Sequence, residues 1–498
     1  MNPAQGWPFG LRLVLAALLG ALAAFGLAPF GLWGATLVAL VLLAPLFLST
    51  ETRGRAAWVG WAFATGYFAH GLSWIIEPFF VDAARHAWMA PFALVFMAGG
   101  LALFWALAFW LARRPGGSVV AQAVFLAVTV SLAEIARGYV LTGFPWAGIA
   151  QVWIDTPVSQ LLSLIGPYGL GALTLLATLP LGVALTQRGG FAFPLGLTAG
   201  TAILAAGYAT TRPAVTKTDH VVRLIQPNAP QHQKWDRNYA PLFFARQVEF
   251  TAAQPRPDLI VWPETSVPEW LGSAQSYLDV IADAAQGTPV FLGIQRGDGP
   301  QIYNSMIYLD QQGQQEGLYD KHHLAPFGEY VPFGNLMAKF GIHGMATTAG
   351  HGFSAGPGAA LMDAGELGQA LPLICYEAVF TQDVLSAPGR ADFLLQITND
   401  AWFGTRSGPY QHLVQAQMRA IEQGLPMMRS ANTGVSAMID PLGRIAKSLP
   451  LGQAGFIDAK LPAPLAPTVY SKVGDLPFFV FLSVLFGLLW RLTRPENA

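Results

Sequence analysis

The sequence has few charged residues and only one cysteine. Of its 498 residues 11% are charged and 53% are hydrophobic, whereas about 25% are charged in a typical soluble domain. This composition excludes an ordinary soluble enzyme, and it excludes a disordered chain, which has too few apolar residues to bury. The one cysteine, Cys375, cannot form an internal disulfide or supply a zinc cluster by itself. With a formal net charge of -1 and no basic run, we expect no nucleic-acid partner.

The charges that are present are unevenly distributed. Residues 1–212 hold 9 arginines, no lysine and 5 acidic residues, whereas residues 213–473 hold 17 lysines and arginines and 22 acidic residues. Seven apolar segments in the first stretch are each about 20 residues long, the length that crosses a bilayer. They span residues 11–27, 31–48, 57–76, 90–112, 118–136, 160–186 and 191–209, and an eighth follows at 475–490.

The arginines favour one orientation of these eight spans. If the N-terminus is cytoplasmic, Arg85 and Arg137 lie in loops on the outer side. Eight others lie on the cytoplasmic side: Arg12, Arg53, Arg55, Arg113, Arg114, Arg188, Arg491 and Arg494. Because cytoplasmic loops carry the excess of positive charge, this pattern predicts three parts. They are seven transmembrane helices in 1–212, an extracytoplasmic domain in 213–473, and an eighth helix with a cytoplasmic tail in 474–498.

Residues 213–473 have the pattern of one α/β domain. Short apolar runs rich in β-branched residues predict strands at 220–228, 258–264, 289–296, 371–377, 393–400 and 435–441. A helix is predicted at 409–425, with Val414, Met418, Ile421 and Leu425 facing a sheet. This alternation implies sheets covered on both faces. The Gly-rich stretch 331–361 interrupts it, and we expect a lid over a site or a segment that dips into the bilayer.

Three titratable residues stand where predicted strands end, the place where sites collect in α/β folds. They are Glu264, Lys321 and Cys375. Cys375 lies at a predicted helix start, whose partial positive charge favours the thiolate. Glu377, two residues further on, opposes this unless its own charge is compensated.

A metal site is not expected. His322 and His323 are adjacent, so we expect them to point in different directions, and no ligand set of suitable spacing lies near them. No Gly-rich nucleotide loop precedes a suitable helix either. We therefore expect no metal and no cofactor.

Several segments resemble the catalytic signatures of the nitrilase, or carbon–nitrogen hydrolase, superfamily, which uses a Glu–Lys–Cys triad. They are WPET (262–265), KHHLAPFGEYVP (321–332) and ICYE (374–377), followed in the family's order by 391–404 and 419–445. With helices before and after this domain, the whole chain resembles the bacterial apolipoprotein N-acyltransferases. The resemblance implies a bundle of eight transmembrane helices joined to a nitrilase-like αββα sandwich.

The resemblance also implies a reaction. A fatty acyl chain passes from a phospholipid, commonly phosphatidylethanolamine, to the α-amino group of the diacylglyceryl-cysteine that begins an apolipoprotein, which is the last step of lipoprotein maturation. The chain would be held as a thioester on Cys375 in a ping-pong mechanism, with Glu264 as proton acceptor and Lys321 stabilising the oxyanion. Supporting roles are implied for Glu329, Tyr376, Glu377 and Trp235, the last beside a substrate pocket. We expect a monomer in the bacterial inner membrane, with its catalytic domain facing the periplasm.

Two other functions fit the same residues less well. One is a membrane-anchored amidase that hydrolyses a small carbon–nitrogen substrate, for which one anchoring helix would suffice. The other is a transporter or scaffold that carries a degenerate nitrilase-like domain, although the intact Glu264, Lys321 and Cys375 argue against degeneration. The size of the acyl group trapped on Cys375 distinguishes the transferase from the amidase.

Overall fold

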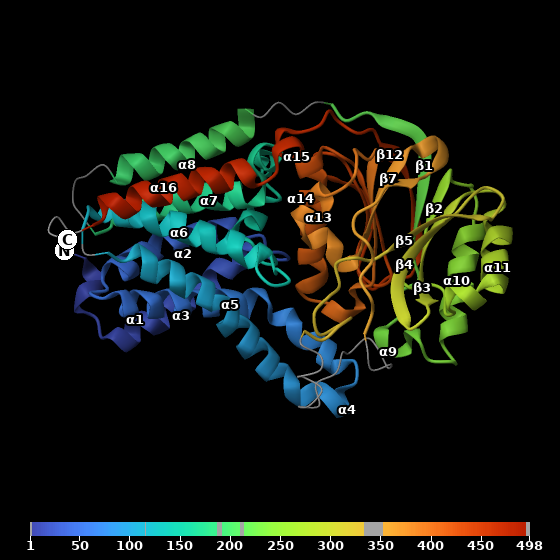
Figure 1. The fold of residues 1–498 in the computed structure, drawn as a ribbon, viewed down its shortest axis with the longest axis horizontal. Coiled ribbons are helices and arrows are strands. Elements are labelled where there is room, and N and C mark those ends of the chain that lie inside the picture. Colours follow the sequence, from blue (N-terminus) through green and yellow to red (C-terminus); the bar gives the residue numbers. More distant parts are fainter. Residues whose placement is uncertain (1, 115, 187–191, 210–213, 333–351, 495–498) are drawn as a thin grey trace. The chain divides into compact units, whose positions relative to one another are not determined.

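The computed structural model describes residues 2–114, 116–186, 192–209, 214–332 and 352–494, and the chain divides into two compact units (Figure 1). The helical unit comprises Met1–Phe79, Ala84–Arg212 and Thr468–Ala498. The sheet unit comprises Phe80–Ala83 and Pro213–Pro467. Most of the lid expected at 331–361 lies outside the described residues, because 333–351 are not among them.

A helix forms within each of the eight apolar segments of the sequence. These helices are α1 (Phe9–Ala23), α2 (Trp33–Leu48), α3 (Arg53–Gly71), α5 (Ala90–Ala112), α6 (Val119–Tyr139), α7 (Leu162–Val183), α8 (Ala192–Ala209) and α16 (Leu476–Leu492). Two short helices lie between the longer elements, α4 (Ala83–His86) and α15 (Val469–Val473). In α7 the chain kinks at Gly166, whose φ of 65° favours glycine and whose α-carbon faces the ring of Tyr470 too closely for a side chain.

Among the described residues, four helical stretches are long and apolar enough to cross a membrane. They are Phe9–Gly26, Ala83–Ala112, Val119–Tyr139 and Pro157–Val183. The apolar helices α2 and α16 are shorter, with 16 and 17 residues. These helices fit a membrane protein, while the crossing by all eight helices stays a prediction.

An ion pair is buried within the helical unit. Glu134 accepts a hydrogen bond from Trp105 Nε1 at 2.8 Å and pairs with Arg137 Nη2 at 2.6 Å. Arg137 also donates to the carbonyl oxygen of Trp146 at 2.8 Å. Arg137 lies within α6 (Val119–Tyr139) and not in the loop where we expected it. Because an unpaired charge is costly among apolar helices, these bonds explain how Glu134 is accommodated.

The sheet unit contains two six-stranded sheets (Figure 1). The first has the order β12-β1-β2-β3-β4-β5, built from β1 (Lys217–Gln226), β2 (Leu259–Val261), β3 (Val290–Asp298), β4 (Gln301–Leu309), β5 (Gln315–Asp320) and β12 (Gly455–Pro462). The second has the order β11-β10-β9-β8-β7-β6, built from β6 (Met362–Asp363), β7 (Gln369–Ile374), β8 (Phe393–Thr398), β9 (Met427–Ala431), β10 (Ser436–Ile439) and β11 (Ile445–Leu449).

In each sheet three strands pair in parallel and the outer strands pair antiparallel. The parallel sets are β1-β2-β3 and β7-β8-β9. All six strands that the sequence predicts are present. The other six strands, β4, β5, β6, β9, β11 and β12, were not predicted.

Apolar side chains fill the space between the two sheets. Val222, Leu259 and Phe291 of the first sheet share one core with Leu395 and Met428 of the second. The outer face of the first sheet packs against α10 (Ala240–Ala252) and α11 (Gln275–Ala285). The outer face of the second packs against α13 (Thr381–Leu385) and α14 (Gly408–Gln423). The sheet unit is therefore the expected αββα sandwich.

Helix α14 confirms the helix predicted at 409–425. Of the four residues expected to face a sheet, Leu425 lies in the core against the second sheet, just beyond the end of the helix. Leu413, Ala416 and Ala420 lie in the core against the sheet. Val414, Met418 and Ile421, which we expected there, are also buried. Every residue of α14 except Tyr410 is buried, so the periodicity of its apolar residues could not identify the face that meets the sheet.

A buried arginine joins the first sheet to the end of α10. Arg223 in β1 is fully buried and binds both carboxylate oxygens of Asp458 in β12, each at 2.7 Å. It also donates to the carbonyl oxygens of Ala253 and Pro255, at 2.6 and 2.7 Å. Removing Arg223 would leave the largely buried carboxylate of Asp458 without its partner, and breaking a buried ion pair in this way costs about 3–5 kcal/mol.

We therefore predict that Arg223→Met lowers the thermal unfolding midpoint of the sheet unit by roughly 10 °C. The matched control is Lys460→Met, because Lys460 pairs with Asp219 at 3.1 Å across the same two strands but on the exposed surface. Such exposed pairs contribute about 0–1 kcal/mol, so the control should unfold like the parent. The measurement is thermal unfolding of the full chain in detergent, and equal midpoints for the two variants would contradict the prediction.

Candidate active site

The three candidate residues each follow a strand of the sandwich. Glu264 lies three residues after β2, Lys321 directly follows β5, and Cys375 directly follows β7. The strands β2 and β5 belong to the first sheet and β7 to the second. All three residues are buried, with exposed fractions of 6% for Glu264, 1% for Lys321 and 8% for Cys375.

The carboxylates of Glu264 and Glu329 form a buried cluster with the ammonium group of Lys321. The Nζ atom of Lys321 lies 2.8 Å from Glu329 Oε2 and 3.9 Å from Glu264 Oε1. Asn304 in β4 bridges the same two carboxylates, because its Nδ2 donates to Glu264 Oε1 at 2.6 Å and to Glu329 Oε1 at 3.1 Å. Glu329 also accepts a hydrogen bond from the backbone of Ala325 at 2.8 Å. The cluster thus holds Glu264 and Lys321 at a fixed separation.

Burial changes the proton affinities of this cluster. Burial alone would lower the pKa of Lys321, but the negative charges of Glu329 and Glu264 outweigh it and raise that pKa. Burial raises the pKa of Glu264, and only part of this is offset by the charge of Lys321. Lys321 therefore stays cationic at neutral pH, while Glu264 has a stronger affinity for a proton than an exposed glutamate. This combination suits a fixed positive charge beside a general base.

The backbone at Cys375 adopts a conformation that favours glycine. Its φ is +52°, which costs a non-glycine residue about 1–3 kcal/mol and must be held by its surroundings. Burial raises the pKa of the thiol, and the negative charge of Glu264 raises it further. We expected a helix N-terminus to favour the thiolate of Cys375, and this expectation is therefore wrong. The helix after β7 is a five-residue 3-10 turn (Cys375–Val379), and burial has the larger effect on the thiol.

Glu377 braces the turn that carries Cys375. Its carboxylate accepts hydrogen bonds from Tyr319 Oη at 2.8 Å and from the backbone N–H groups of His322 at 2.8 Å and Ile374 at 2.6 Å. These donors compensate the charge of Glu377, which would otherwise act directly on Cys375 two residues away. Glu377 therefore fixes the end of β7 relative to the segment that follows Lys321.

The other predicted residues lie around this centre. Tyr376 is buried, and its ring packs at 4.8 Å against that of Phe380. Trp235 is 44% exposed. His322 and His323 do not point apart as we expected, because both contact the carboxylate of Asp383, at 3.8 and 2.8 Å. Among the described residues no group of three His, Cys, Asp or Glu side chains is arranged to hold a metal ion.

A second buried network holds the backbone of Cys375, and the sequence did not point to it. Gln396 Nε2 donates to the carbonyl oxygen of Cys375 at 3.2 Å, and His412 Nε2 lies 3.1 Å from the same oxygen. His412 Nδ1 lies 2.8 Å from Asp400, whose other oxygen binds Arg429 at 2.5 Å. Because burial and the charge of Arg429 lower the pKa of His412, the network contains one anion, one cation and a neutral imidazole.

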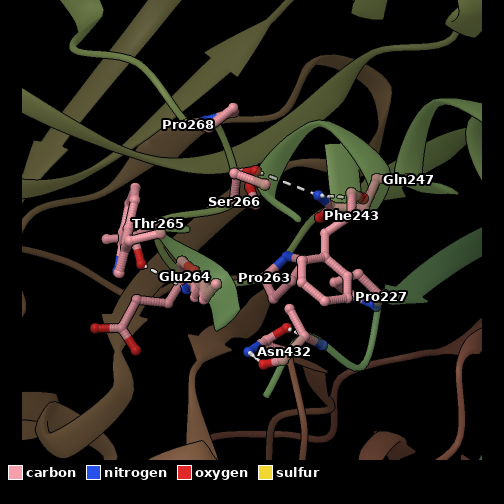
Figure 2. Close-up of a pocket in the computed structure, with 13 residues that line it drawn as sticks. Pro227, Phe243, Gln247, Pro263, Glu264, Thr265, Ser266, Pro268 and Asn432 are labelled. Atoms are coloured by element: carbon pink, nitrogen blue, oxygen red, sulfur yellow. Dashed lines mark hydrogen bonds between the residues drawn. The ribbon is translucent and has the colours of Figure 1, made fainter. Parts of the chain in front are cut away.

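The turn that carries Glu264 lines a small pocket in the sheet unit. Figure 2 shows the carboxylate of Glu264 pointing away from Phe243 and Asn432, which line the pocket. Gln247 reaches across it to donate to the carbonyl oxygen of Ser266 at 3.2 Å. Lys234, the last residue of α9 (Gln231–Lys234), also lines it. The sequence did not identify Lys234 or Asn304, although Lys234 directly precedes Trp235, because their partners Glu264, Thr265 and Glu329 are distant in the sequence.

Family models match both parts of the chain. The carbon–nitrogen hydrolase model matches residues 215–468, and the model of the apolipoprotein N-acyltransferase N-terminal domain matches residues 19–180. The apolipoprotein N-acyltransferase of Rhodopseudomonas palustris is 37% identical over 99% of this chain and 97% of its own length. That of Caulobacter vibrioides is also 37% identical, over 94% of this chain and 92% of its own length.

Two solved structures align with about half of the chain. An amidase from Nesterenkonia sp. is 17% identical and covers 54% of this chain and 99% of its own, with a TM-score of 0.37. A carbon–nitrogen hydrolase superfamily protein from Xanthomonas campestris is 19% identical and covers 53% of this chain and 97% of its own, with a TM-score of 0.34.

The raised pKa of Cys375 gives a prediction for its reactivity. Only the thiolate is nucleophilic, so labelling by iodoacetamide should be slow at pH 7 and should still be rising at pH 9, above the midpoint of about 8.5 for a free cysteine. Because the chain has one cysteine, intact mass spectrometry reports on this residue alone. Cys375→Ser gives the unlabelled control. A labelling rate that levels off below pH 7 would show a stabilised thiolate and contradict this account.

Proposed function

Because this chain belongs to the apolipoprotein N-acyltransferase family, we propose that Glu264, Lys321 and Cys375 carry out its acyl transfer. The enzyme transfers a fatty acyl chain from a phospholipid to the α-amino group of the diacylglyceryl-cysteine that begins an apolipoprotein. This reaction is the last step of lipoprotein maturation. The steps assigned to each residue below are our proposal.

In the first half-reaction the phospholipid ester is cleaved. Glu264 accepts the proton of the Cys375 thiol as the sulfur attacks the ester carbonyl carbon. Lys321 stabilises the negative charge that develops on the carbonyl oxygen. When the carbon–oxygen bond breaks, Glu264 returns the proton to the leaving oxygen. The products are a lysophospholipid and an acyl thioester on Cys375.

In the second half-reaction the neutral amino group of the apolipoprotein attacks the thioester. Glu264 accepts a proton from this nitrogen and passes it to the departing sulfur, so an amide forms and the thiol is regenerated. Lys321 again faces the oxyanion. Since the two substrates react in turn with one cysteine, the kinetics are ping-pong.

The observation that carries this proposal is the buried cluster of a base and a cation beside one thiol. Lys321 Nζ lies 3.9 Å from Glu264 Oε1, and the charges of both residues act on Cys375. All three are less than 10% exposed. Burial supports acyl transfer over hydrolysis, because a thioester kept away from water survives until the amine arrives.

The following finer points are also proposals. We propose that all eight long helices cross the bacterial inner membrane and that residues 213–473 face the periplasm, as the distribution of arginines favours. We propose phosphatidylethanolamine as the acyl donor and a monomer as the working form. Glu329, Glu377 and Tyr376 are proposed to support the triad, and Trp235 is proposed to border the site from its exposed position.

Substitution of the nucleophile and the base gives a test of their roles. In membranes supplied with phospholipid and a diacylated lipopeptide, Cys375→Ala should lower the rate of N-acylation by at least about 10⁴-fold. Glu264→Gln should lower it by about 10²- to 10⁴-fold, because the general base is lost. Mass spectrometry of the lipopeptide measures the product. Glu249→Gln, an exposed glutamate on α10, is the control and should retain activity. Activity in Cys375→Ala would eliminate the covalent mechanism.

The proposed orientation predicts the location of the C-terminus. A green fluorescent protein fused after residue 498 should fluoresce, because it folds in the cytoplasm, whereas alkaline phosphatase fused at the same point should be inactive. The reverse result would contradict the proposed orientation, in which eight helices cross from a cytoplasmic N-terminus.

A further inference from the structure

A second buried lysine lies beside the catalytic glutamate. Lys234 is 7% exposed, and its Nζ donates to the carbonyl oxygen of Glu264 at 2.9 Å and to Thr265 Oγ1 at 2.7 Å. Both acceptors are neutral oxygens, so this lysine contributes a positive charge to the site in addition to that of Lys321. The ring centre of the neighbouring Trp235, which the sequence analysis singled out, lies 5.5 Å from the same ammonium, and Trp235 is 44% exposed and lines the pocket.

The turn that Lys234 binds is conformationally demanding. Thr265 has a φ of +44°, which disfavours a β-branched residue. On its other side the turn presses against Gly293 in β3, where a Cβ would lie 2.5 Å from Thr265 N and 2.7 Å from Glu264 Cα. Ser266 N donates to Gly293 O at 2.8 Å. The backbone of Glu264 is therefore held between β3 and the ammonium of Lys234.

The charge of Lys234 also reaches the carboxylate of Glu264. The charged groups that act on Glu264 are Lys321 and Lys234, which lower its pKa, and Glu329, which raises it together with the larger effect of burial. The hydrogen bond from Asn304 lowers it as well. Lys234 itself faces Glu264 and Cys375, and burial lowers its pKa to about 8. Its charge is therefore present at neutral pH and is lost in mildly alkaline solution.

We propose that Lys234 is a positioning residue, which fixes the turn at Glu264 and whose positive charge extends the activity of this base to lower pH. This inference rests on the proposed role of Glu264 as proton acceptor. The direction follows from the charges. Without Lys234 the carboxylate of Glu264 binds its proton more tightly, so a higher pH is needed before it can accept the proton of Cys375.

The test is the pH profile of acyl-enzyme formation by the full-length enzyme with phosphatidylethanolamine vesicles, measured in a single turnover by intact mass. The acid limb of this profile is the part at low pH where the rate rises as Glu264 loses its proton. In Lys234→Met this limb should move to higher pH by about one unit, which lowers the rate on the limb about tenfold. The parent and this variant should converge above pH 9, where Lys234 has lost its proton. Lys234→Arg should keep the limb of the parent, because it keeps the charge.

Two further variants separate charge from folding. Lys234→Gln keeps a hydrogen-bond donor but loses the charge, so the same shift is expected if Lys234→Met does not fold. Lys447→Met is the matched control, because Lys447 also donates to a backbone carbonyl of the sheet unit, that of Asp458 at 2.9 Å, but on the exposed surface. Its pH profile should equal that of the parent.

An acid limb that stays in place in both Lys234→Met and Lys234→Gln would overturn the inference, even if the rates fall at every pH. This failure is distinct from failure of the proposed function. If Glu264→Gln abolishes acyl-enzyme formation and the limb is still unmoved, only the role of Lys234 is wrong. If Glu264→Gln forms the acyl-enzyme normally, the assignment of the base itself is wrong.

Discussion

The site depends on the burial of opposite charges in one small volume. Glu264, Glu329 and Lys321 are all removed from water, so the buried ammonium of Lys321 and the two carboxylates depend on each other for charge compensation. Asn304 ties the two carboxylates together. The strands β2, β4 and β5 bring these residues to one sheet, while β7 of the other sheet supplies Cys375. The two sheets therefore place Glu264 and Lys321 where their charges act on the thiol of Cys375.

The same burial favours the thiol form of Cys375, the residue that we propose as nucleophile. Burial raises the pKa of Cys375 as well as that of Glu264, so in the proposed mechanism the thiol passes its proton to Glu264 as the sulfur attacks the substrate. The backbone of Cys375 has a positive φ, and its carbonyl oxygen accepts a hydrogen bond from Gln396. His412 contacts the same oxygen. In the proposed mechanism the same exclusion of water protects the thioester from hydrolysis.

The sequence predicted the parts of this structure that are encoded locally. Apolar β-branched runs located six strands, and the motif residues located Glu264, Lys321 and Cys375 at strand ends. The polar edge strands β5 and β11 could not be found, because their pairing depends on neighbours distant in sequence. Lys234 and Asn304 were missed for a similar reason. The thiolate expected at Cys375 was wrong because a five-residue turn has little dipole, whereas burial can be judged only in the folded chain.

The central claim is that the fatty chain passes through Cys375, and a chase experiment tests it most directly. The enzyme is loaded with phosphatidylethanolamine that carries an isotopically labelled fatty chain, freed of lipid, and mixed with a diacylated lipopeptide while both masses are followed. The account predicts that the label sits on Cys375 and moves to the lipopeptide in one turnover. Acylation of the lipopeptide while the label remains on the protein, or label on any other residue, would contradict it.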